Sequence, residues 1–248
     1  MFWLESRKVI KITGSNALAF LNRIVTADLE KLKQDEFLFS ALLNSKSRFL
    51  YDFFIFLNGK DILIDLNKNC VDGFINTIKY YDLLDEYKIT IDKDLYVFAE
   101  KGFLSNWNNG KFEGRLLSST KKANYTNESL YNEERIKFCL PDGFCELIKE
   151  KSIILDYGYE STGAISFTKG CYIGQELITR TKRVGEIRKG LCCVEIISNL
   201  KILEETKEIK VLSTFGKCAL LLMYKKDYAN KIELNIDGNI FKIISKRI

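Results

Sequence analysis

Apolar residues recur with two different periods along the first hundred residues, and this alternation constrains the fold of the 248-residue chain. Runs typical of strands cover residues 8–12, 37–43, 48–57, 61–66, 87–91 and 94–99. Two other stretches, beginning at Ala17 and Val71, place apolar side chains at i, i+3, i+4 and i+7, which predicts one amphipathic helix for each. Asn58-Gly59 predicts a hairpin turn. The order of these elements predicts an α+β fold, with helices packed on a mostly antiparallel sheet.

Later parts of the chain differ in composition, which predicts further domains after a first α+β domain at 1–100. Residues 101–140, a polar stretch followed by a helix starting at Asn127 or Ser129, are expected to form a second α+β subdomain. Residues 141–185 are expected to connect it to the remainder. Strand-like runs alone follow, at 186–197, 207–212, 218–224, 232–236 and 241–244, with a hairpin turn at Asp237-Gly238. We therefore expect a small C-terminal β-barrel at 186–248.

The chain has no histidine and seven cysteines. The absence of histidine excludes Ser-His and Cys-His nucleophile pairs and the common histidine-based zinc sites. No Cys-x-x-Cys pair occurs, and an odd number of irregularly spaced cysteines predicts reduced thiols rather than a disulfide framework. Cys192 and Cys193 lie in the middle of one strand-like run, so they are expected to point to opposite faces and to pack in the core.

Composition predicts a folded protein of the cytoplasm. The chain is 46% hydrophobic, and no window approaches the roughly 20 consecutive apolar residues of a membrane span. The first residues show neither a signal-peptide nor a transit-peptide pattern. A net charge of +5 is mild, and it suits a small anionic ligand as well as weak contact with nucleic acid.

The stretch 166–190 carries an unusual density of functional groups. Three glycines surround Cys171, which lies two residues after Lys169 and just before a predicted helix start at Gly174. A thiol near an ammonium and ahead of a helix N-terminus is expected to have a lowered pKa. The alternative is a buried structural cysteine in a glycine-rich turn, which is the usual role of a free cysteine.

The eight residues Lys169-Gly-Cys-Tyr-Ile-Gly-Gln-Glu176 resemble the signature of the YgfZ/Iba57 family of folate-binding iron–sulfur cluster assembly and repair proteins. This family is related to the aminomethyltransferase, or T-protein, of the glycine cleavage system. Weaker agreement covers most of the chain, including Gly14 and Thr26-x-Asp28. The resemblance implies a T-protein-like fold, in which small α+β domains surround a central cavity that holds tetrahydrofolate or a one-carbon derivative of it.

Asp52 is the most unusual residue of the predicted sheet. It lies in mid-strand among aromatic residues, where a carboxylate is costly unless it faces a ligand, a partner or solvent. Ser47-Arg48-x-x-x-Asp52 resembles the family pattern Gly-Arg-x-x-x-Asp, with serine in place of glycine. The resemblance implies that Asp52 contacts the folate; the alternative is a solvent-facing position.

Further binding residues follow from the resemblance. It implies a cavity lined by Tyr172, Gln175 and Glu176 beside Asp52, with Lys169 or Arg183 reaching the glutamate tail of the folate. Arg135 occupies a place where relatives carry Arg-Ile, and it is either an anion contact or a surface arginine.

These residues favour a tetrahydrofolate-binding factor that promotes assembly or repair of [4Fe–4S] proteins, including radical tRNA-modifying enzymes. Cys171 would act with Lys169, as a redox-active thiol or as a transient cluster ligand shared with an assembly or client protein, because one cysteine cannot hold a cluster alone. Neither a membrane nor a nucleic acid is expected as a partner. The alternatives are a folate-dependent aminomethyl or methyl transferase and a non-enzymatic RNA-binding module. Relatives with aminomethyltransferase activity have aspartate at the position of Cys171, which argues against the first alternative.

Overall fold

The computed structural model describes residues 1–34, 36–100, 115–120, 125–196, 208–236 and 239–247. Most of the polar stretch that follows residue 100, and the hairpin turn predicted at Asp237-Gly238, lie outside these residues. No helix within the described ranges is both long and apolar enough to cross a membrane.

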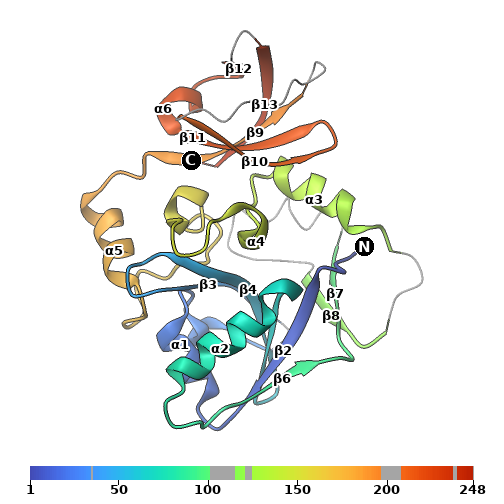
Figure 1. Ribbon diagram of the computed structural model, residues 1–248, viewed down its shortest axis with the longest axis vertical. Coiled ribbons are helices and arrows are strands. Elements are labelled where there is room, and N and C mark those ends of the chain that lie inside the picture. The colour runs from blue at the N-terminus through green and yellow to red at the C-terminus, as the bar shows by residue number, and fades with distance from the viewer. Residues whose placement is uncertain (35, 101–114, 121–124, 197–207, 237–238, 248) are drawn as a thin grey trace.

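The predicted antiparallel sheet forms the lower half of the molecule (Figure 1). Its strands run in the order β3-β4-β5-β2-β6, and every neighbouring pair is antiparallel. The strands are β2 (Arg7–Thr13), β3 (Phe37–Leu43), β4 (Phe49–Asn58), β5 (Asp61–Asn67) and β6 (Lys88–Asp92). The predicted hairpin is confirmed, since Asn58 pairs with Asp61 and Gly59 adopts a φ of 62°.

Both predicted helices pack against one face of this sheet. They are α1 (Ala17–Ile24) and α2 (Val71–Tyr81). Each buries three of the four residues that the i, i+3, i+4, i+7 pattern selects, such as Leu21 of α1 and Phe74 of α2, and half-buries the fourth, Phe20 or Ile75. Phe53 and Ile55 of β4 contact the same core. Because side chains alternate along a strand, Asp52 and Phe54 therefore point to the opposite face.

A second, three-stranded sheet joins residues from both sides of position 100. It contains β1 (Phe2–Trp3), β7 (Tyr96–Ala99) and β8 (Arg115–Ser118), in the order β1-β7-β8. Strands that precede and follow residue 100 pair directly in this sheet. The predicted domain boundaries stay predictions.

The other face of the large sheet is covered by a middle layer. It consists of α3 (Glu128–Lys137), α4 (Gly143–Glu146) and α5 (Gln175–Val184), with irregular chain and the short 3-10 helix η4 (Ile154–Tyr157). Two further 3-10 helices, η1 (Leu29–Lys31) and η2 (Lys68–Cys70), flank α1 and α2. Asn127 accepts a hydrogen bond from Leu130 N, which confirms it as the N-cap of α3.

The C-terminal strands form a five-stranded antiparallel sheet in the order β10-β11-β9-β13-β12. They are β9 (Lys189–Glu195), β10 (Ile209–Phe215), β11 (Cys218–Tyr224), β12 (Glu233–Ile236) and β13 (Asn239–Arg247), with α6 (Lys225–Tyr228) after β11. Within the part of the chain that the structure describes, the sheet does not close into the expected barrel. Cys192 and Cys193 contact different cores, as their adjacent positions on a strand predict.

Candidate functional site

Asp52 lies between the large sheet and the middle layer, and it does not project from a polar outer face into solvent. Its Oδ2 accepts hydrogen bonds from Gly143 N, at 2.9 Å, and from the hydroxyl of Tyr159, at 2.8 Å. A Cβ at position 143 would lie 2.4 Å from Oδ1, so only glycine allows this approach. Oδ1 has no hydrogen-bond partner among the described residues, and it is available to a ligand.

A cavity of about 300 Å³ opens beside Asp52. It lies where β4, the start of α2 and α4 meet. Its lining is mostly apolar and aromatic, with one carboxylate and one ammonium group: Phe49, Leu50, Tyr51, Asp52, Asn69, Cys70, Gly73, Gly143, Phe144, Leu147 and Lys149. Lys149 Nζ donates to the hydroxyl of Tyr51 at 2.5 Å and lies 4.2 Å from the centre of its ring. An apolar cavity with a few polar groups is the usual form of a small-molecule site.

Burial raises the pKa of Asp52 to about 6, and the nearby charge of Asp142 adds to the increase. Arg7 and the hydrogen bonds from Tyr159 and Gly143 act in the opposite direction. The carboxyl group can therefore gain or lose a proton near neutral pH, as a general acid or base requires.

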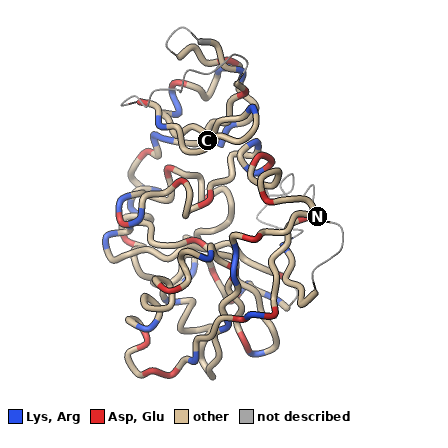
Figure 2. The backbone as a smooth tube through the Cα atoms, turned by 45° about the vertical axis from the view of Figure 1, so that its right-hand side comes forward, with Lys and Arg blue, Asp and Glu red and all other residues tan. Residues whose placement is uncertain are grey.

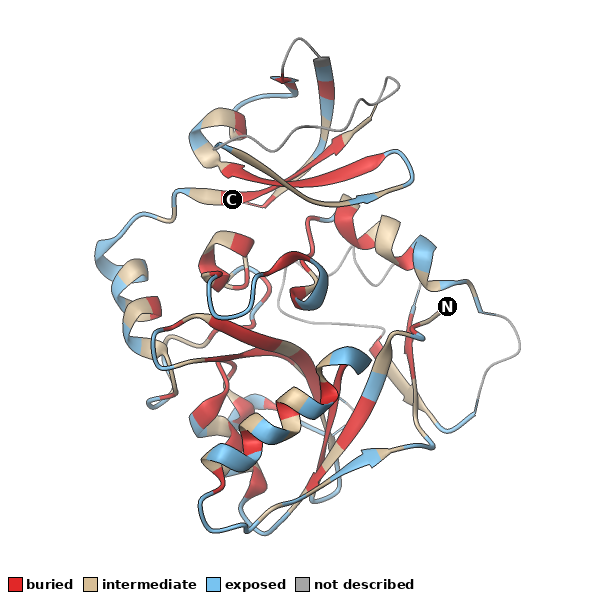
Figure 3. Ribbon diagram, viewed as in Figure 1, coloured by how far each residue is buried: buried red, intermediate tan, exposed pale blue. Residues whose placement is uncertain are grey.

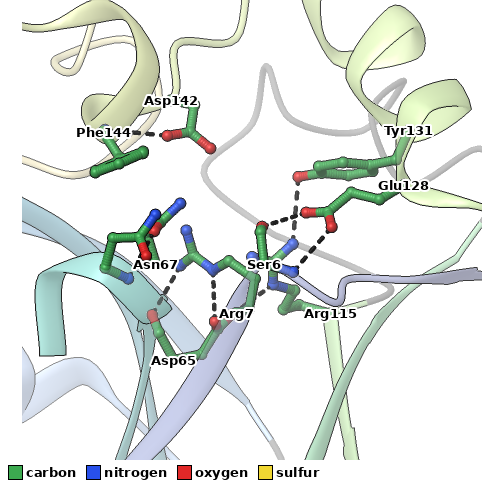
Figure 4. Close-up of polar contacts among 10 residues, drawn as sticks. Ser6, Arg7, Asp65, Asn67, Arg115, Glu128, Tyr131, Asp142 and Phe144 are labelled. Atoms are coloured by element: carbon green, nitrogen blue, oxygen red, sulfur yellow. Dashed lines mark hydrogen bonds and ion pairs between the residues drawn. The ribbon is translucent and has the colours of Figure 1, made fainter.

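Arg7 and Arg115 line a small cavity together with Asp52. Both arginines bind Asp65 (Figure 4). Asp65 Oδ1 and Oδ2 bind the Nε atoms of Arg7 and Arg115, each at 2.7 Å. Arg115 also donates to the hydroxyl of Tyr131, which projects from α3. Burial disfavours the charge of Arg7, but the carboxylates of Asp65, Asp142 and Asp52 outweigh it and raise its pKa. The network holds a positive charge close to Asp52.

The space where the large sheet, the three-stranded sheet and the middle layer meet is nearly filled by this network. The remaining cavity there measures about 20 Å³. It is lined by Leu4, Arg7, Phe39, Asp52, Phe54, Arg115, Glu128, Tyr131, Arg135, Leu140, Pro141 and Asp142. Asp52 lines both cavities, and only the first, of about 300 Å³, has room for a ring system.

Arg135 is a buried residue rather than a surface arginine, and its Nη2 has no hydrogen-bond partner among the described residues. It is buried, and its Nη1 contacts Glu146 Oε1 at 2.8 Å and the carbonyl oxygen of Leu140 at 2.7 Å. Burial disfavours its charge, but Glu146 and Asp142 outweigh this effect and raise the pKa of Arg135. Its role as an anion contact stays a prediction, which would rest on the unpartnered Nη2.

Lys169 anchors the 166–174 turn. Its Nζ donates to the carbonyl oxygens of Asn22, Val25 and Ala27, at 2.7, 2.6 and 2.6 Å. These carbonyls lie at and after the C-terminal end of α1, where a cation is favourable. Burial lowers the pKa of Lys169 to about 8, against the acidic neighbours Asp28 and Glu30.

The serine in the Gly-Arg-x-x-x-Asp pattern takes the conformation of a glycine. Ser47 is buried with a φ of 60°, and its hydroxyl donates to the carbonyl oxygen of Gly174 at 2.6 Å. Gly174 has a φ of 78°, and a Cβ there would lie 2.7 Å from Asn44 O. The two stretches that resemble the family therefore contact each other directly.

The predicted residues of this turn do not gather around the cavity beside Asp52. Cys171 is exposed, and it lines neither that cavity nor the small central one. Tyr172 is buried in the core with Lys169 Nζ 4.9 Å from its ring centre, and burial raises its pKa to about 12. Gln175 accepts a hydrogen bond from Tyr172 N.

The remaining two predicted contacts belong to α5. Glu176 and Arg183 are exposed, and α5 buries only Ile178 (Figure 3). The expectation that Tyr172, Gln175, Glu176, Lys169 and Arg183 share one cavity with Asp52 does not match these positions, because the turn packs on α1 and on residues 44–47 instead.

Sequence reasoning missed two residues that line the cavity, Gly143 and Lys149, and a donor to Asp52, Tyr159. Gly143 follows Pro141-Asp142, a turn signal that gave no hint of contact with a strand ninety residues earlier. Tyr159 and Lys149 lie in irregular chain without any periodic pattern. Only the packing of the middle layer on β4 brings these residues to Asp52.

Comparisons with known proteins agree with this architecture. No protein-family model matches the chain. A protein of Pyricularia oryzae named iron-sulfur cluster assembly factor IBA57 homolog, mitochondrial, is 27% identical over 217 residues, which cover 75% of this chain and 54% of the relative. Proteins of the same name from Coccidioides immitis and Dictyostelium discoideum are each 26% identical. The chain spans a little over half the length of these relatives.

The fold has a solved counterpart. The crystal structure of the glycine cleavage system aminomethyltransferase T from Bartonella henselae superimposes with a TM-score of 0.70 over 98% of this chain and 83% of that one, at 12% identity. At this identity the likeness concerns the fold. This chain is thus similar in sequence to proteins named as IBA57 iron–sulfur cluster assembly factor homologues, and it has the fold of the aminomethyltransferase.

Proposed function

We propose that this protein binds tetrahydrofolate, or a one-carbon derivative of it, and promotes the assembly or repair of [4Fe–4S] proteins. The observation that carries the proposal is Asp52, which presents a carboxylate oxygen without a partner among the described residues to a cavity of about 300 Å³. This volume is at the lower end of the range for small-molecule sites, roughly 300 to 1,000 Å³. It suits a pterin ring whose tail extends outward.

The donor set fits a reduced folate. A pterin edge presents N–H groups, for which Asp52 is an acceptor, and its ring packs against aromatic side chains such as Tyr51 and Phe144. Lys149 replaces Lys169 and Arg183 as the cation for a tail carboxylate, because it lines the cavity and they do not. A bound folate supplies a one-carbon carrier at this site.

Cys171 acts at a separate, exposed place. Its thiol lies at the outside of a turn that Lys169 and Gly174 fix to the body of the protein. An exposed, rigidly held sulfur can be reached by a second protein, which would supply the other ligands of a cluster. We propose iron–sulfur assembly and client proteins, including radical tRNA-modifying enzymes, as partners, in a cytoplasmic compartment that keeps the cysteines reduced.

Calorimetric titration with tetrahydrofolate tests the cavity. The wild-type protein is expected to bind one folate, and Asp52→Ala to bind it at least tenfold more weakly. Asp94→Ala, an exposed carboxylate removed from the cavity lining, is the matched control and is expected to match the wild type. Saturable binding that Asp52→Ala leaves unchanged would place the folate elsewhere.

Complementation tests the thiol. In cells that lack the protein, [4Fe–4S] enzyme activities are expected to fall, and Cys171→Ser is expected not to restore them. Cys145→Ser is the matched control, because Cys145 is also exposed but lies in α4, and its pKa is raised by burial to about 12. Full restoration by Cys171→Ser would reject the assigned role.

A second candidate, a folate-dependent aminomethyl or methyl transferase, is favoured by the raised pKa of Asp52, about 6, which suits proton transfer near neutrality. Turnover of an aminomethyl or N-methyl donor by the purified protein, lost in Asp52→Asn, would support it. Absence of turnover with bound folate would leave the assembly factor as the function.

A further inference from the structure

A second cavity, of about 380 Å³, lies between the middle layer and the C-terminal sheet. It is formed where the chain around η4, the link from α5 to β9, α6 and the end of β13 meet. Its lining residues are Leu155, Gly158, Glu160, Ser161, Lys182, Ile187, Lys189, Gly190, Lys225 and Arg247. It shares no lining residue with the cavity beside Asp52, so a ligand bound here is independent of the proposed folate site.

Cations dominate this lining. Lys182, Lys189, Lys225 and Arg247 face a single carboxylate, Glu160. Lys182 forms an ion pair with that carboxylate. Lys189 and Lys225 have no ion pair among the described residues, although Asp156 and Glu186 lie near enough to act on Lys225 through their charges. In Figure 2, basic positions gather on the side of the molecule where α5 leads toward the C-terminal sheet.

Arg247 contributes a buried charge that no carboxylate neutralises within the described chain. It is 6% exposed. Its guanidinium donates to the carbonyl oxygens of Cys139 and Phe138 and to the hydroxyl of Ser161, at 3.1, 3.2 and 2.8 Å, and all three acceptors are neutral. Gly158, with a φ of 74°, provides the space, since a Cβ there would lie 2.4 Å from Arg247 Cδ. A buried cation is normally paired, so its field is available to an anion in the cavity.

Lys225 shows the same deficit of negative charge. Burial lowers its pKa, against the opposing effects of Glu160, Asp156 and Glu186. Lys189 lies with its Nζ 5.2 Å from the ring centre of Tyr224, and Asp156 is near enough to act on it through its charge without forming an ion pair. Two ammonium groups and a buried guanidinium therefore converge on one space.

We infer that this cavity binds a small ligand carrying two or more phosphate groups. A carboxylate ligand is bound best by an arginine that has two parallel N–H groups free. Arg247 does not offer such a pair, because its Nε and both Nη atoms already donate to the protein. The free donors are lysine ammonium groups, which bind phosphate as point charges. The volume exceeds the need of a single phosphate and accommodates a diphosphate group with a small organic substituent.

Titration with pyrophosphate at constant ionic strength tests this assignment. The wild-type protein is expected to bind one pyrophosphate saturably, more tightly than inorganic phosphate by at least tenfold. Lys225→Gln and Lys189→Gln are each expected to weaken binding about tenfold, because each removes one half-buried charge. Glu160→Gln is expected to tighten binding several-fold, since it frees Lys182 from its ion pair.

Lys226→Gln is the matched control. Lys226 follows Lys225 in α6, is exposed and does not line the cavity, so its variant is expected to bind like the wild type. Unchanged thermal midpoints establish that the variants are folded. The assignment would be overturned if the wild type showed no saturable binding of pyrophosphate. It would also be overturned if Lys225→Gln and Lys226→Gln bound pyrophosphate equally well, or if the wild type bound citrate as tightly as pyrophosphate.

Discussion

At the scale of single residues, two positions hold conformations or charges that the folded state makes costly. Asp52 is a carboxylate kept away from water, and Ser47 is a non-glycine residue at positive φ. Both costs occur next to the features that we assign to function. Such costs are common at functional sites, where the surrounding structure compensates for them.

Asp52→Asn is expected to stabilise the protein at pH 7 and to weaken folate binding. The raised pKa means that the folded protein holds this proton more tightly than the unfolded chain between pH about 4 and 6. Stability from this group therefore falls as pH rises through that window. The free energy of unfolding of Asp52→Asn, measured with urea, should exceed that of the wild type by about 1 to 2 kcal/mol at pH 7 and by nearly zero at pH 4. A loss of stability at pH 7 would contradict the assigned cost.

Folate affinity is expected to follow the same ionisation. Both oxygens of Asp52 are acceptors only when the carboxylate is ionised. The affinity for folate, whose pterin edge presents N–H donors, should therefore decline as the pH falls below about 6. Calorimetry between pH 5 and 8 measures this dependence. A profile that is flat in the wild type, or identical in Asp52→Asn, would remove Asp52 from the site.

Ser47→Ala and Ser47→Gly are expected to differ. Alanine keeps the positive φ and loses the hydrogen bond to Gly174, which should cost about 1 to 2 kcal/mol. Glycine loses the same bond but relieves roughly 1 kcal/mol of backbone cost, so it should lie within about 0.5 kcal/mol of the wild type. Urea unfolding measures both, and equal destabilisation would show that the φ of 60° carries no cost.

At the scale of elements, the 166–174 turn depends on its contacts with α1. Lys169 binds three carbonyl oxygens at the end of that helix, and Ser166 N donates to Thr26 O at 2.9 Å. These contacts explain why a lysine stands two residues before Cys171. It is a positioning residue for the turn.

Lys169→Met is expected to destabilise the protein by about 2 to 3 kcal/mol, because three buried carbonyl oxygens lose a charged donor. The rate of alkylation of Cys171 by iodoacetamide should change less than about threefold under folding conditions, since the Lys169 ammonium is bound by three carbonyl oxygens. Lys33→Met, at an exposed lysine, serves as control. A large fall in alkylation rate without destabilisation would restore the activating role.

At the scale of the whole molecule, a buried ion pair of the middle layer is hydrogen-bonded to the C-terminal sheet. Arg135 of α3 binds Glu146 of α4, and Glu146 also accepts from the hydroxyl of Ser213 in β10, at 2.6 Å. Arg247 makes a second connection, from β13 to the end of α3. The C-terminal sheet is thus attached through polar contacts as well as through the shared apolar core.

Arg135→Met is expected to cost about 3 to 5 kcal/mol, because it leaves Glu146 charged and unpaired in the interior. Adding Glu146→Gln should recover a large part of this loss, since glutamine keeps an acceptor for Ser213. Lys137→Met, on the same helix at a half-exposed ion pair, should cost less than about 1 kcal/mol. Additive losses in the double variant, measured by urea unfolding, would show that the pair does not link the layers.

The sequence by itself determined the local elements, the α+β class and the family resemblance. Period-2 and period-3.6 patterns selected the strands and helices of the first hundred residues, because burial on one face dictates those periods. The sequence also singled out Asp52, whose charge is out of place in a strand. It did not reveal that Ser47 takes a glycine conformation, since that requires the contact with Gly174.

Tertiary structure alone decided which of these residues meet. The resemblance placed Cys171, Lys169 and Tyr172 with Asp52 around one hollow, whereas packing directs the lysine to α1, the tyrosine into the core and the thiol outward. Gly143 and Lys149 reach Asp52 through contacts between segments almost a hundred residues apart. Local periodicity records which face of an element is buried. It carries no information on which distant segment covers that face, and this pairing determines the cavity.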